Sequence, residues 1–285
     1  MSRSSQSIKA IVNSIQKFYP TRLADKSWDN TGLLVEGSSL DVSVTEDKSA
    51  QLNILLTIDL TQSVADEGVA HNSSLILAYH PFIFRGLKSI TTKDPQQRSL
   101  LKLISNGISV YCPHTAIDAA KGGVNDFLAD GLAALQSLKS REVCDSDPKD
   151  HNEGEGMGRL VEFNEPVALT ALVKQIKSHL QIDHVQVATA DEHKKISTVA
   201  LCAGSGGSVF KGVDADLYYT GELSHHEALF FKENGKTVIL TNHTNCERGY
   251  LTVVKENLQR DLSEQGYTNV DIKISETDVD PLKTW

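Results

Sequence analysis

The chain has 285 residues, with 28 Lys and Arg against 37 Asp and Glu, and its formal net charge at pH 7 is -9. This acidic balance lacks the basic footprint of a nucleic-acid-binding protein, and no apolar run approaches the roughly 20 residues of a membrane span. A chain of this length buries a large core in one or two domains. Its four cysteines include no Cys-x-x-Cys pair, which favours free thiols in a reducing compartment.

The first expected element is a helix over residues 6–19, which ends at Pro20 because proline disfavours a helical conformation in the residue before it. Its apolar side chains fall on one face, as in a helix that packs against a core: Ile8, Ile11, Val12, Ile15 and Phe18. The segment is also basic and serine-rich with no acid before Asp25, which is typical of a mitochondrial presequence. We favour the helix and expect a cytoplasmic protein, with the mitochondrion or the nucleus as alternatives.

The rest of the first half alternates short apolar runs with helical periods. The expected elements, in order, are strands at 32–36 and 53–58, a helix at 61–71, a strand at 75–79, a helix at 95–106, a strand at 108–112 and a helix at 123–135. Continuous apolar runs of this kind are typical of a largely parallel sheet that is buried on both faces.

The second half repeats this order of elements. It is expected to hold a helix at 166–180 capped by Asn164, strands at 185–188 and 198–202, a Gly-rich turn with a short helix, a strand at 216–220, and a helix at 225–234. A strand at 237–240, a helix at 246–264 and a strand at 270–274 follow. We therefore predict an α/β fold of two related lobes, residues 1–140 and 159–285, that arose by internal duplication. A mobile acidic connector over 141–158 joins them.

One motif, His-Thr-x-x-(Asp/Glu), follows the same predicted strand in each half, as His114 to Asp118 and as His243 to Glu247. Functional groups gather at the carboxyl ends of strands in parallel α/β sheets, and an imidazole and a carboxylate four positions apart can hold a divalent cation there. Taken alone, Glu247 is better explained as a first-turn helix acid and His243 as a loop residue, but the repeat at Asp118 reverses this preference and favours a metal site shared by the lobes. These donors suit zinc, iron or manganese better than calcium or magnesium.

Other polar groups near strand ends have structural alternatives. His80, within Tyr79-His80-Pro81, follows one strand, whereas Asp59 is interpreted as a helix cap. The turn 204–207 can bind a phosphate through its backbone N–H groups or serve as a packing turn. His226 begins a helix and is interpreted as a polar helix start. The sequence shows neither a serine-nucleophile elbow nor a dinucleotide-binding fingerprint, which disfavours those enzyme classes.

Taken together and in order, the motifs resemble the Nif-three-like family, also labelled GTP cyclohydrolase I type 2-like. The resemblance spans nearly the whole chain and is strongest to short fungal members that lack a large inserted central domain. It rests on Trp28-Asp29-Asn30-Thr31-Gly32-Leu33, Tyr79-His80-Pro81, His114-Thr115-Ala116-Ile117-Asp118, Gly204-Ser205-Gly206-Gly207, Thr220-Gly221-Glu222 and His243-Thr244-Asn245-Cys246-Glu247.

The resemblance implies two related α/β lobes with a dinuclear metal site between them, and homohexameric rings. The metal ligands that it implies are His80, Asp118, His243 and Glu247, with His114 beside them. The expected cofactor is one or two divalent ions of zinc, iron or manganese. Tyr79 stands where many bacterial relatives have a second histidine, and a phenol is a poorer ligand unless it ionises, so the second ion depends on this position.

The function predicted from these residues is that of a divalent-metal-dependent hydrolase of a small phosphorylated or nucleotide-like substrate, with His114 or His226 as the candidate general base. The alternative is a non-enzymatic, metal-containing scaffold or regulator that binds a transcriptional adaptor, and metal storage is a third interpretation. Neither the cyclohydrolase label nor the family name establishes an activity, so the sequence leaves open whether the protein is an enzyme.

Overall fold

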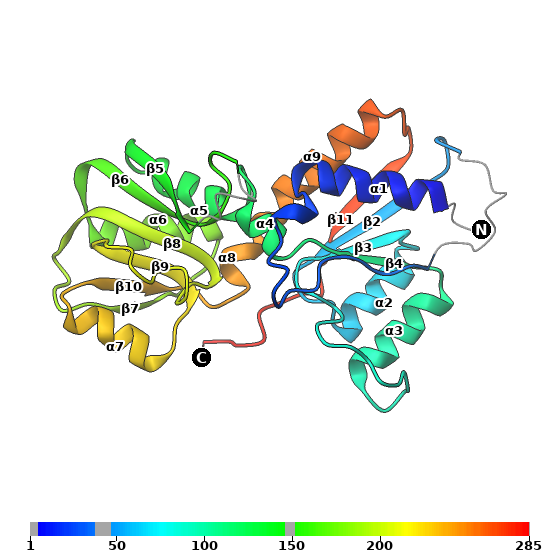
Figure 1. The fold of residues 1–285 in the computed structure, drawn as a ribbon, viewed down its shortest axis with the longest axis horizontal. Coiled ribbons are helices and arrows are strands. Elements are labelled where there is room, and N and C mark those ends of the chain that lie inside the picture. The colour runs from blue at the N-terminus through cyan, green and yellow to red at the C-terminus, as the bar shows by residue number, and fades with distance from the viewer. Residues whose placement is uncertain (1–4, 38–46, 146–151, 285) are drawn as a thin grey trace. The chain divides into compact units, whose positions relative to one another are not determined.

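The computed structural model describes residues 5–37, 47–145 and 152–284, and its elements fall into two compact units, each built around its own sheet (Figure 1). Unit 1 consists of Met1–Ile117 and Leu251–Val279, and unit 2 consists of Asp118–Tyr250 and Asp280–Trp285. The fold is therefore α/β, as predicted. The division of the chain differs from the predicted lobes, 1–140 and 159–285, because each unit takes segments from two parts of the sequence.

The sheet of unit 1 has the strand order β1-β4-β3-β2-β11. These strands are β1 Gly32–Val35, β2 Leu52–Thr57, β3 Leu75–Ala78, β4 Ser109–Cys112 and β11 Val270–Ile274. Strand β1 pairs antiparallel with β4, and the other neighbours are parallel. Because β2, β3 and β4 are apolar and almost wholly buried, they form the two-sided core that the continuous apolar runs predicted.

Helices cover both faces of this sheet, with α1 and α9 on one face and α2 and α3 on the other (Figure 1). Their bounds are α1 Ser5–Phe18, α2 Gln62–Ala70, α3 Pro95–Ser105 and α9 Leu251–Glu264. Helix α1 confirms the helix expected over residues 6–19, and a short 3-10 turn, Thr21–Leu23, follows it. Hydrogen bonding fixes α9 in unit 1, since Ser14 Oγ of α1 donates to Asp261 at 2.6 Å.

The sheet of unit 2 has the strand order β5-β6-β8-β9-β10-β7. Its strands are β5 Leu138–Asp145, β6 Met157–Ala168, β7 Gln186–Ala188, β8 Lys195–Ser205, β9 Leu217–Glu222 and β10 Thr237–Leu240. Strands β8, β9 and β10 are parallel, whereas β7 is antiparallel to β10, and β5 and β6 extend the other edge antiparallel. The helices are α5 Val124–Ala133, α6 Leu169–Leu180, α7 His225–Glu233 and α8 Asn245–Arg248.

Several predicted elements of unit 2 are corrected. The connector expected over 141–158 contributes to strands β5 and β6, and only its residues 146–151 lie outside the described residues. Asn164 is part of β6 rather than a helix cap, because that strand continues to Ala168, where α6 begins. The single helix expected over 246–264 is two helices, and the break between α8 and α9 is where the chain leaves unit 2 for unit 1.

Four strands are arranged alike in both sheets. The order β1-β4-β3-β2 in unit 1 matches β7-β10-β9-β8 in unit 2, and in each case the first strand is antiparallel to three parallel ones. The outer strands differ, since β11 is parallel to β2 whereas β6 is antiparallel to β8. This repeated arrangement supports the predicted duplication. None of the helices in the described ranges combines the length and the apolarity that a bilayer crossing requires.

Candidate metal-binding residues

In unit 1, His80 lies directly after β3 and is oriented by a carboxylate from the neighbouring strand end. Its Nδ1 lies 2.9 Å from Oδ1 of Asp59, which follows β2. A hydrogen bond from Nδ1–H to a carboxylate selects the tautomer whose Nε2 carries the lone pair, and metal-ligating histidines are commonly held in this way. The prediction that Asp59 caps a helix is wrong, because the side chain of Thr61 caps α2.

A second oriented imidazole, His114, follows β4 in unit 1. Its Nδ1 lies 2.7 Å from Oδ1 of Asp29, and the backbone N–H of Thr115 donates to the other carboxylate oxygen at 3.3 Å. Burial raises the pKa of Asp29, but the hydrogen bonds and charge of His114 and the hydroxyl of Thr115 outweigh that effect and lower it. Asp29 is therefore ionised at neutral pH, where it orients His114.

Tyr79, His80 and His114 are neighbours in unit 1. The ring of Tyr79 is buried and meets both imidazoles edge-on, with centroid distances of 5.3 Å to His80 and 6.3 Å to His114. The two imidazole centroids are 5.5 Å apart. We call these three residues with Asp29 and Asp59 the unit 1 cluster.

In unit 2, His243 and Glu247 converge. His243 follows β10, and Glu247, one helical turn later in α8, is only 2 % exposed. Nε2 of His243 lies 3.5 Å from Oε1 of Glu247, and its Nδ1 lies 2.9 Å from Oε1 of Glu222 at the end of β9. This histidine is therefore oriented by one carboxylate while its other nitrogen faces a second one.

Gly204, at the end of β8, leaves space beside both donor atoms. Its φ is +63°, and a Cβ atom there would lie 3.0 Å from Nε2 of His243 and 3.0 Å from Oε1 of Glu247. A side chain at this position would therefore enter the space next to the donors, which a metal ion needs.

Asp118, in the short helix α4 Thr115–Ala119, is a buried carboxylate of the same unit. Its carbonyl accepts a hydrogen bond from Asn125 at 2.9 Å, and Asn125 in turn accepts from the backbone N–H of Ala203 in β8. Burial raises the pKa of the Cys202 thiol, and the charge of Asp118 adds to this effect. We call Asp118, Gly204, Glu222, His243 and Glu247 the unit 2 cluster.

The Gly-rich turn is a packing turn rather than a phosphate cradle. The backbone N–H of Gly204 donates to Sγ of Cys246 at 3.1 Å, and that of Gly206 donates to Oγ1 of Thr220 at 3.0 Å. Two of the donors that a phosphate would need are therefore engaged. The short helix expected after the turn is replaced by further turns.

His226, the other histidine considered as a base, lies on α7 and lines a different cavity. Its ring is 5.4 Å from that of His225. The cavity has a volume of about 610 Å³ and is bordered by the aromatic side chains Phe210, Tyr218 and Phe231. No residue of the unit 2 cluster lines it, so we do not retain His226 as a candidate base.

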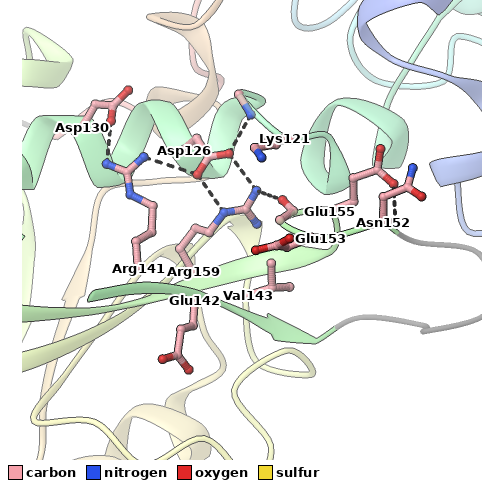
Figure 2. Close-up of a pocket in the computed structure, with 12 residues that line it drawn as sticks. Lys121, Asp126, Asp130, Arg141, Glu142, Val143, Asn152, Glu153, Glu155 and Arg159 are labelled. Atoms are coloured by element: carbon pink, nitrogen blue, oxygen red, sulfur yellow. Dashed lines mark hydrogen bonds and ion pairs between the residues drawn. The ribbon is translucent and has the colours of Figure 1, made fainter. Parts of the chain in front are cut away.

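A buried ion pair holds the segment that follows Asp118. Figure 2 shows Arg159 of β6 reaching Asp126 of α5, at the wall of a cavity of about 710 Å³. Arg159 is 2 % exposed, and its Nε and Nη2 donate to the two carboxylate oxygens of Asp126, each at 2.8 Å. Its guanidinium also donates to the carbonyls of Ala120, Gly154, Gly156 and Gly158.

The carboxylate of Asp126 neutralises the charge of the buried Arg159. Burial raises the pKa of Asp126, but the hydrogen bonds and charge of Arg159 outweigh it and lower that pKa. The pair joins the start of β6 to the first turn of α5. Sequence reasoning missed it, because the residues just before Arg159 were assigned to a connector over 141–158.

Taken together, these observations define an α/β protein of two sheets whose parallel strands end in carboxylate-oriented histidines. Residues 6–281 match the family described as Duf34/NIF3 (NGG1p interacting factor 3). The chain belongs to this family, which confirms the resemblance found in the sequence.

Relatives agree with this assignment over nearly their full length. The chain is 48% identical over 280 residues to NGG1-interacting factor 3 of Saccharomyces cerevisiae, covering 95% of each chain. It is 47% identical over 285 residues to Protein NIF3 homolog of Schizosaccharomyces pombe, covering 98% of each. Among solved structures, a Bacillus cereus protein related to NIF3 superposes with a TM-score of 0.81 over 97% of this chain and 98% of that one. Its sequence identity of 21% means that this likeness concerns the fold alone.

Proposed function

We propose that the protein binds one or two divalent metal ions through His80, Asp118, His243 and Glu247, and that it hydrolyses a small phosphorylated or nucleotide-like substrate. The observation that carries this proposal is the orientation of two histidines, since Nδ1 of His80 and Nδ1 of His243 each lie 2.9 Å from a carboxylate oxygen. Carboxylates in this position fix the ring and make Nε2 a better ligand.

The donor chemistry supports zinc, iron or manganese. Among the described residues, His80, His243 and Glu247 are candidate ligands by their donor types, and a mixture of imidazole and carboxylate suits these ions. Glu247 and Asp118 are buried carboxylates, and a buried negative charge is costly unless a cation or hydrogen bonds compensate for it. A bound ion of this kind supplies a hydroxide nucleophile at neutral pH and neutralises charge that develops on the substrate.

His114 has the orientation of a proton acceptor in such a reaction. Its Nδ1 is held by the ionised Asp29, so Nε2 is the nitrogen that accepts a proton. The carboxylate also stabilises the imidazolium that results, as in other His–Asp pairs. We therefore assign the role of general base to His114.

Metal content and turnover test the proposal together. The purified chain is analysed for zinc, iron and manganese, stripped with a chelator, reloaded, and assayed on nucleotides and phosphomonoesters. We expect His243→Ala to lose bound metal and turnover, whereas His225→Ala, which replaces an exposed histidine on α7, keeps both. Equal metal content and equal turnover in the two variants would exclude the proposal.

A second candidate function, binding of a protein partner, is favoured by the name of the Saccharomyces cerevisiae relative, NGG1-interacting factor 3. A regulator of this kind needs no turnover, and it agrees with the alternative drawn from the sequence. Capture of purified NGG1 by the wild-type chain and by His243→Ala tests it. Equal capture separates the partner role from the metal, and no capture by either form counts against it.

The implied assembly and location belong to the same proposal. A homohexameric ring has six times the 31.1 kDa mass of the chain, which sedimentation measures directly. The cytoplasm, the nucleus and the mitochondrion are distinguished by the position of a fluorescently tagged chain in cells.

A further inference from the structure

The motif that begins with Trp28 holds an exposed indole in a fixed position in unit 1. Trp28 is 52% exposed, yet its Nε1 donates a hydrogen bond of 2.8 Å to Asp25. Asp25 also accepts from the backbone N–H of Ser27 at 2.9 Å and donates its own N–H to Thr115 at 3.0 Å. The indole is therefore oriented by polar contacts although about half of the residue faces solvent.

A second exposed ring, Phe84, stands next to this indole. Phe84 is 46% exposed, and its ring centroid lies 6.1 Å from that of Trp28. The two loops are joined, because Nδ2 of Asn30 donates to the carbonyl of Ile83. Phe82 is buried and anchors the loop that runs on from His80. We call the pair Trp28 and Phe84 the aromatic wall.

The aromatic wall adjoins the candidate catalytic imidazole. The Trp28 and His114 rings meet edge-on with centroids 5.7 Å apart, and the His114 and His80 centroids are 5.5 Å apart. A planar group that lies against the wall is therefore next to His114. Nucleobases stack on aromatic side chains of this kind, because every base has a π-face.

Two cations near the wall are available to the phosphate of a ligand. Lys26 and Arg85 lie close to Trp28 and Phe84 in the sequence, and both are exposed. The carboxylate of Asp25, which accepts the hydrogen bond of the Trp28 indole, adds a negative charge beside the wall. A sugar phosphate would use the charges alone, whereas a nucleotide would use both the charges and the wall.

We propose that Trp28 and Phe84 bind the planar heterocycle of the substrate, which makes the substrate class purine-like nucleotides rather than sugar phosphates. The heterocycle stacks on the wall, and the phosphate or ring bond to be hydrolysed then lies toward His114. This inference deepens the proposed function and rests on it for the reaction, but binding of the heterocycle is measured without turnover.

Tryptophan fluorescence tests the inference directly. The chain has two tryptophans, Trp28 and Trp285, so Trp285→Phe leaves Trp28 as the single reporter. This variant is titrated with adenosine 5′-monophosphate, adenosine and ribose 5-phosphate, with and without reloaded metal. We expect the two adenine compounds to quench Trp28 and ribose 5-phosphate to leave its emission unchanged.

Substitutions in the aromatic wall measure how much the wall contributes to the affinity for adenine compounds. Since a base stacked on an aromatic side chain loses roughly ten- to hundredfold in affinity when that side chain becomes alanine, we expect this loss for Phe84→Ala and, by calorimetry, for Trp28→Ala. Phe230→Ala is the matched control, because Phe230 is a 64% exposed ring on α7 of unit 2. It is expected to bind adenosine 5′-monophosphate as the wild type does.

The outcomes separate this inference from the proposed hydrolase. Adenine binding that depends on the wall, without any turnover, supports the inference and contradicts the hydrolase. Turnover of nucleotides that is equal in wild type, Trp28→Ala and Phe84→Ala overturns the inference and leaves the hydrolase intact. Unchanged adenine binding with an altered sedimentation mass in the two variants also overturns it, because the wall would then be a contact between protein chains.

Discussion

The two clusters each pair a histidine with a carboxylate at neighbouring strand ends but surround the pair differently. In unit 1, His80 and Asp59 follow β3 and β2, and in unit 2, His243 follows β10 and Glu222 ends β9. The pairs are shifted by one strand, because β10 corresponds to β4 and β9 to β3. The unit 1 cluster adds a second imidazole and rings, whereas the unit 2 cluster adds buried carboxylates and a glycine. One strand arrangement has therefore come to supply imidazoles and a stacking surface in unit 1, and negative charge in unit 2.

This difference predicts that the clusters respond differently to substitution. Under the proposed function, neutralising Asp118 or Glu247 of the unit 2 cluster removes a ligand for a cation. Replacing a side chain of the unit 1 cluster or of the aromatic wall disturbs the orientation of imidazoles and the binding of a planar ligand. Five predictions compare the two units, and each substitution has a control in the other unit or at a matched position.

The largest effect is expected from Asp126→Asn in unit 2, which leaves Arg159 buried with an uncompensated charge. Removing one partner of a buried pair costs about 3–5 kcal/mol. Urea unfolding followed by hydrogen exchange should show this loss in unit 2. The control Asp66→Asn removes an exposed partner of Lys102 in unit 1, where less than about 1 kcal/mol is expected. Equal losses in the two variants would contradict the role given to Arg159.

The same pair has a definite pH dependence. Because the pKa of Asp126 is lower in the folded protein, its contribution to stability is complete above the pKa of an unfolded aspartate, about 3.9. The contribution is lost as the pH falls through the lowered pKa of the folded state. The stability difference between wild type and Asp126→Asn should therefore shrink below pH about 4.

Glu247→Gln tests the negative charge of the unit 2 cluster. The substitution keeps the size of the side chain but removes its charge, and we expect metal affinity to fall by more than about 100-fold, beyond what the loss of an orienting group costs. Competition with a chromophoric chelator measures this. Glu256→Gln, at an exposed position of α9, should bind metal as the wild type does. A Glu247→Gln variant with full affinity would show that this carboxylate is not a ligand.

Substitutions of the two carboxylates that orient histidines compare the metal affinity of the two clusters directly. Asp59→Asn in unit 1 and Glu222→Gln in unit 2 each replace the partner of a histidine Nδ1, which typically costs about 10–100-fold in metal affinity. Similar losses mean that both clusters bind metal. A loss from Glu222→Gln alone would confine metal binding to unit 2 and remove His80 from the ligand set.

The smallest effect is expected from Gly204→Ala, compared with Gly212→Ala in the same unit. Both glycines have a positive φ, +63° and +80°, so each variant is strained by about 1–2 kcal/mol. Only at Gly204 would the new Cβ approach His243 and Glu247, since nothing lies within 4 Å of a Cβ at Gly212. Thermal unfolding should show similar losses for the two variants, and metal affinity should fall only for Gly204→Ala.

The sequence predicted well what depends on local pattern. The run that became β3 is apolar throughout, the run that became β4 is apolar after Ser109, and both are wholly buried, so their positions followed from composition alone. The two His-Thr motifs follow β4 and β10 as expected, because a change from apolar to polar residues marks a strand end.

What the sequence could not give were the contacts between distant segments. Asp59 has the pattern of a helix cap, and only the parallel pairing of β2 with β3 brings it to His80. Asp29 lies 85 positions from His114. The region around Arg159 is polar because it carries a buried pair, and polarity on its own was interpreted as a sign of a connector. The spacing of apolar residues indicates which side chains are buried, but it does not indicate which distant residues they contact.

The path of the chain has a consequence for synthesis on the ribosome. Unit 2 between Asp118 and Tyr250 is continuous, whereas unit 1 needs Leu251–Val279 for α9 and β11. Nascent domains fold as they emerge, so the part of unit 1 that is made first has β2 as an open sheet edge, which is prone to pair with other chains. Strand β11 covers this edge only after the middle of the polypeptide has emerged. Truncation before Leu251 is therefore expected to give aggregation rather than an isolated N-terminal domain.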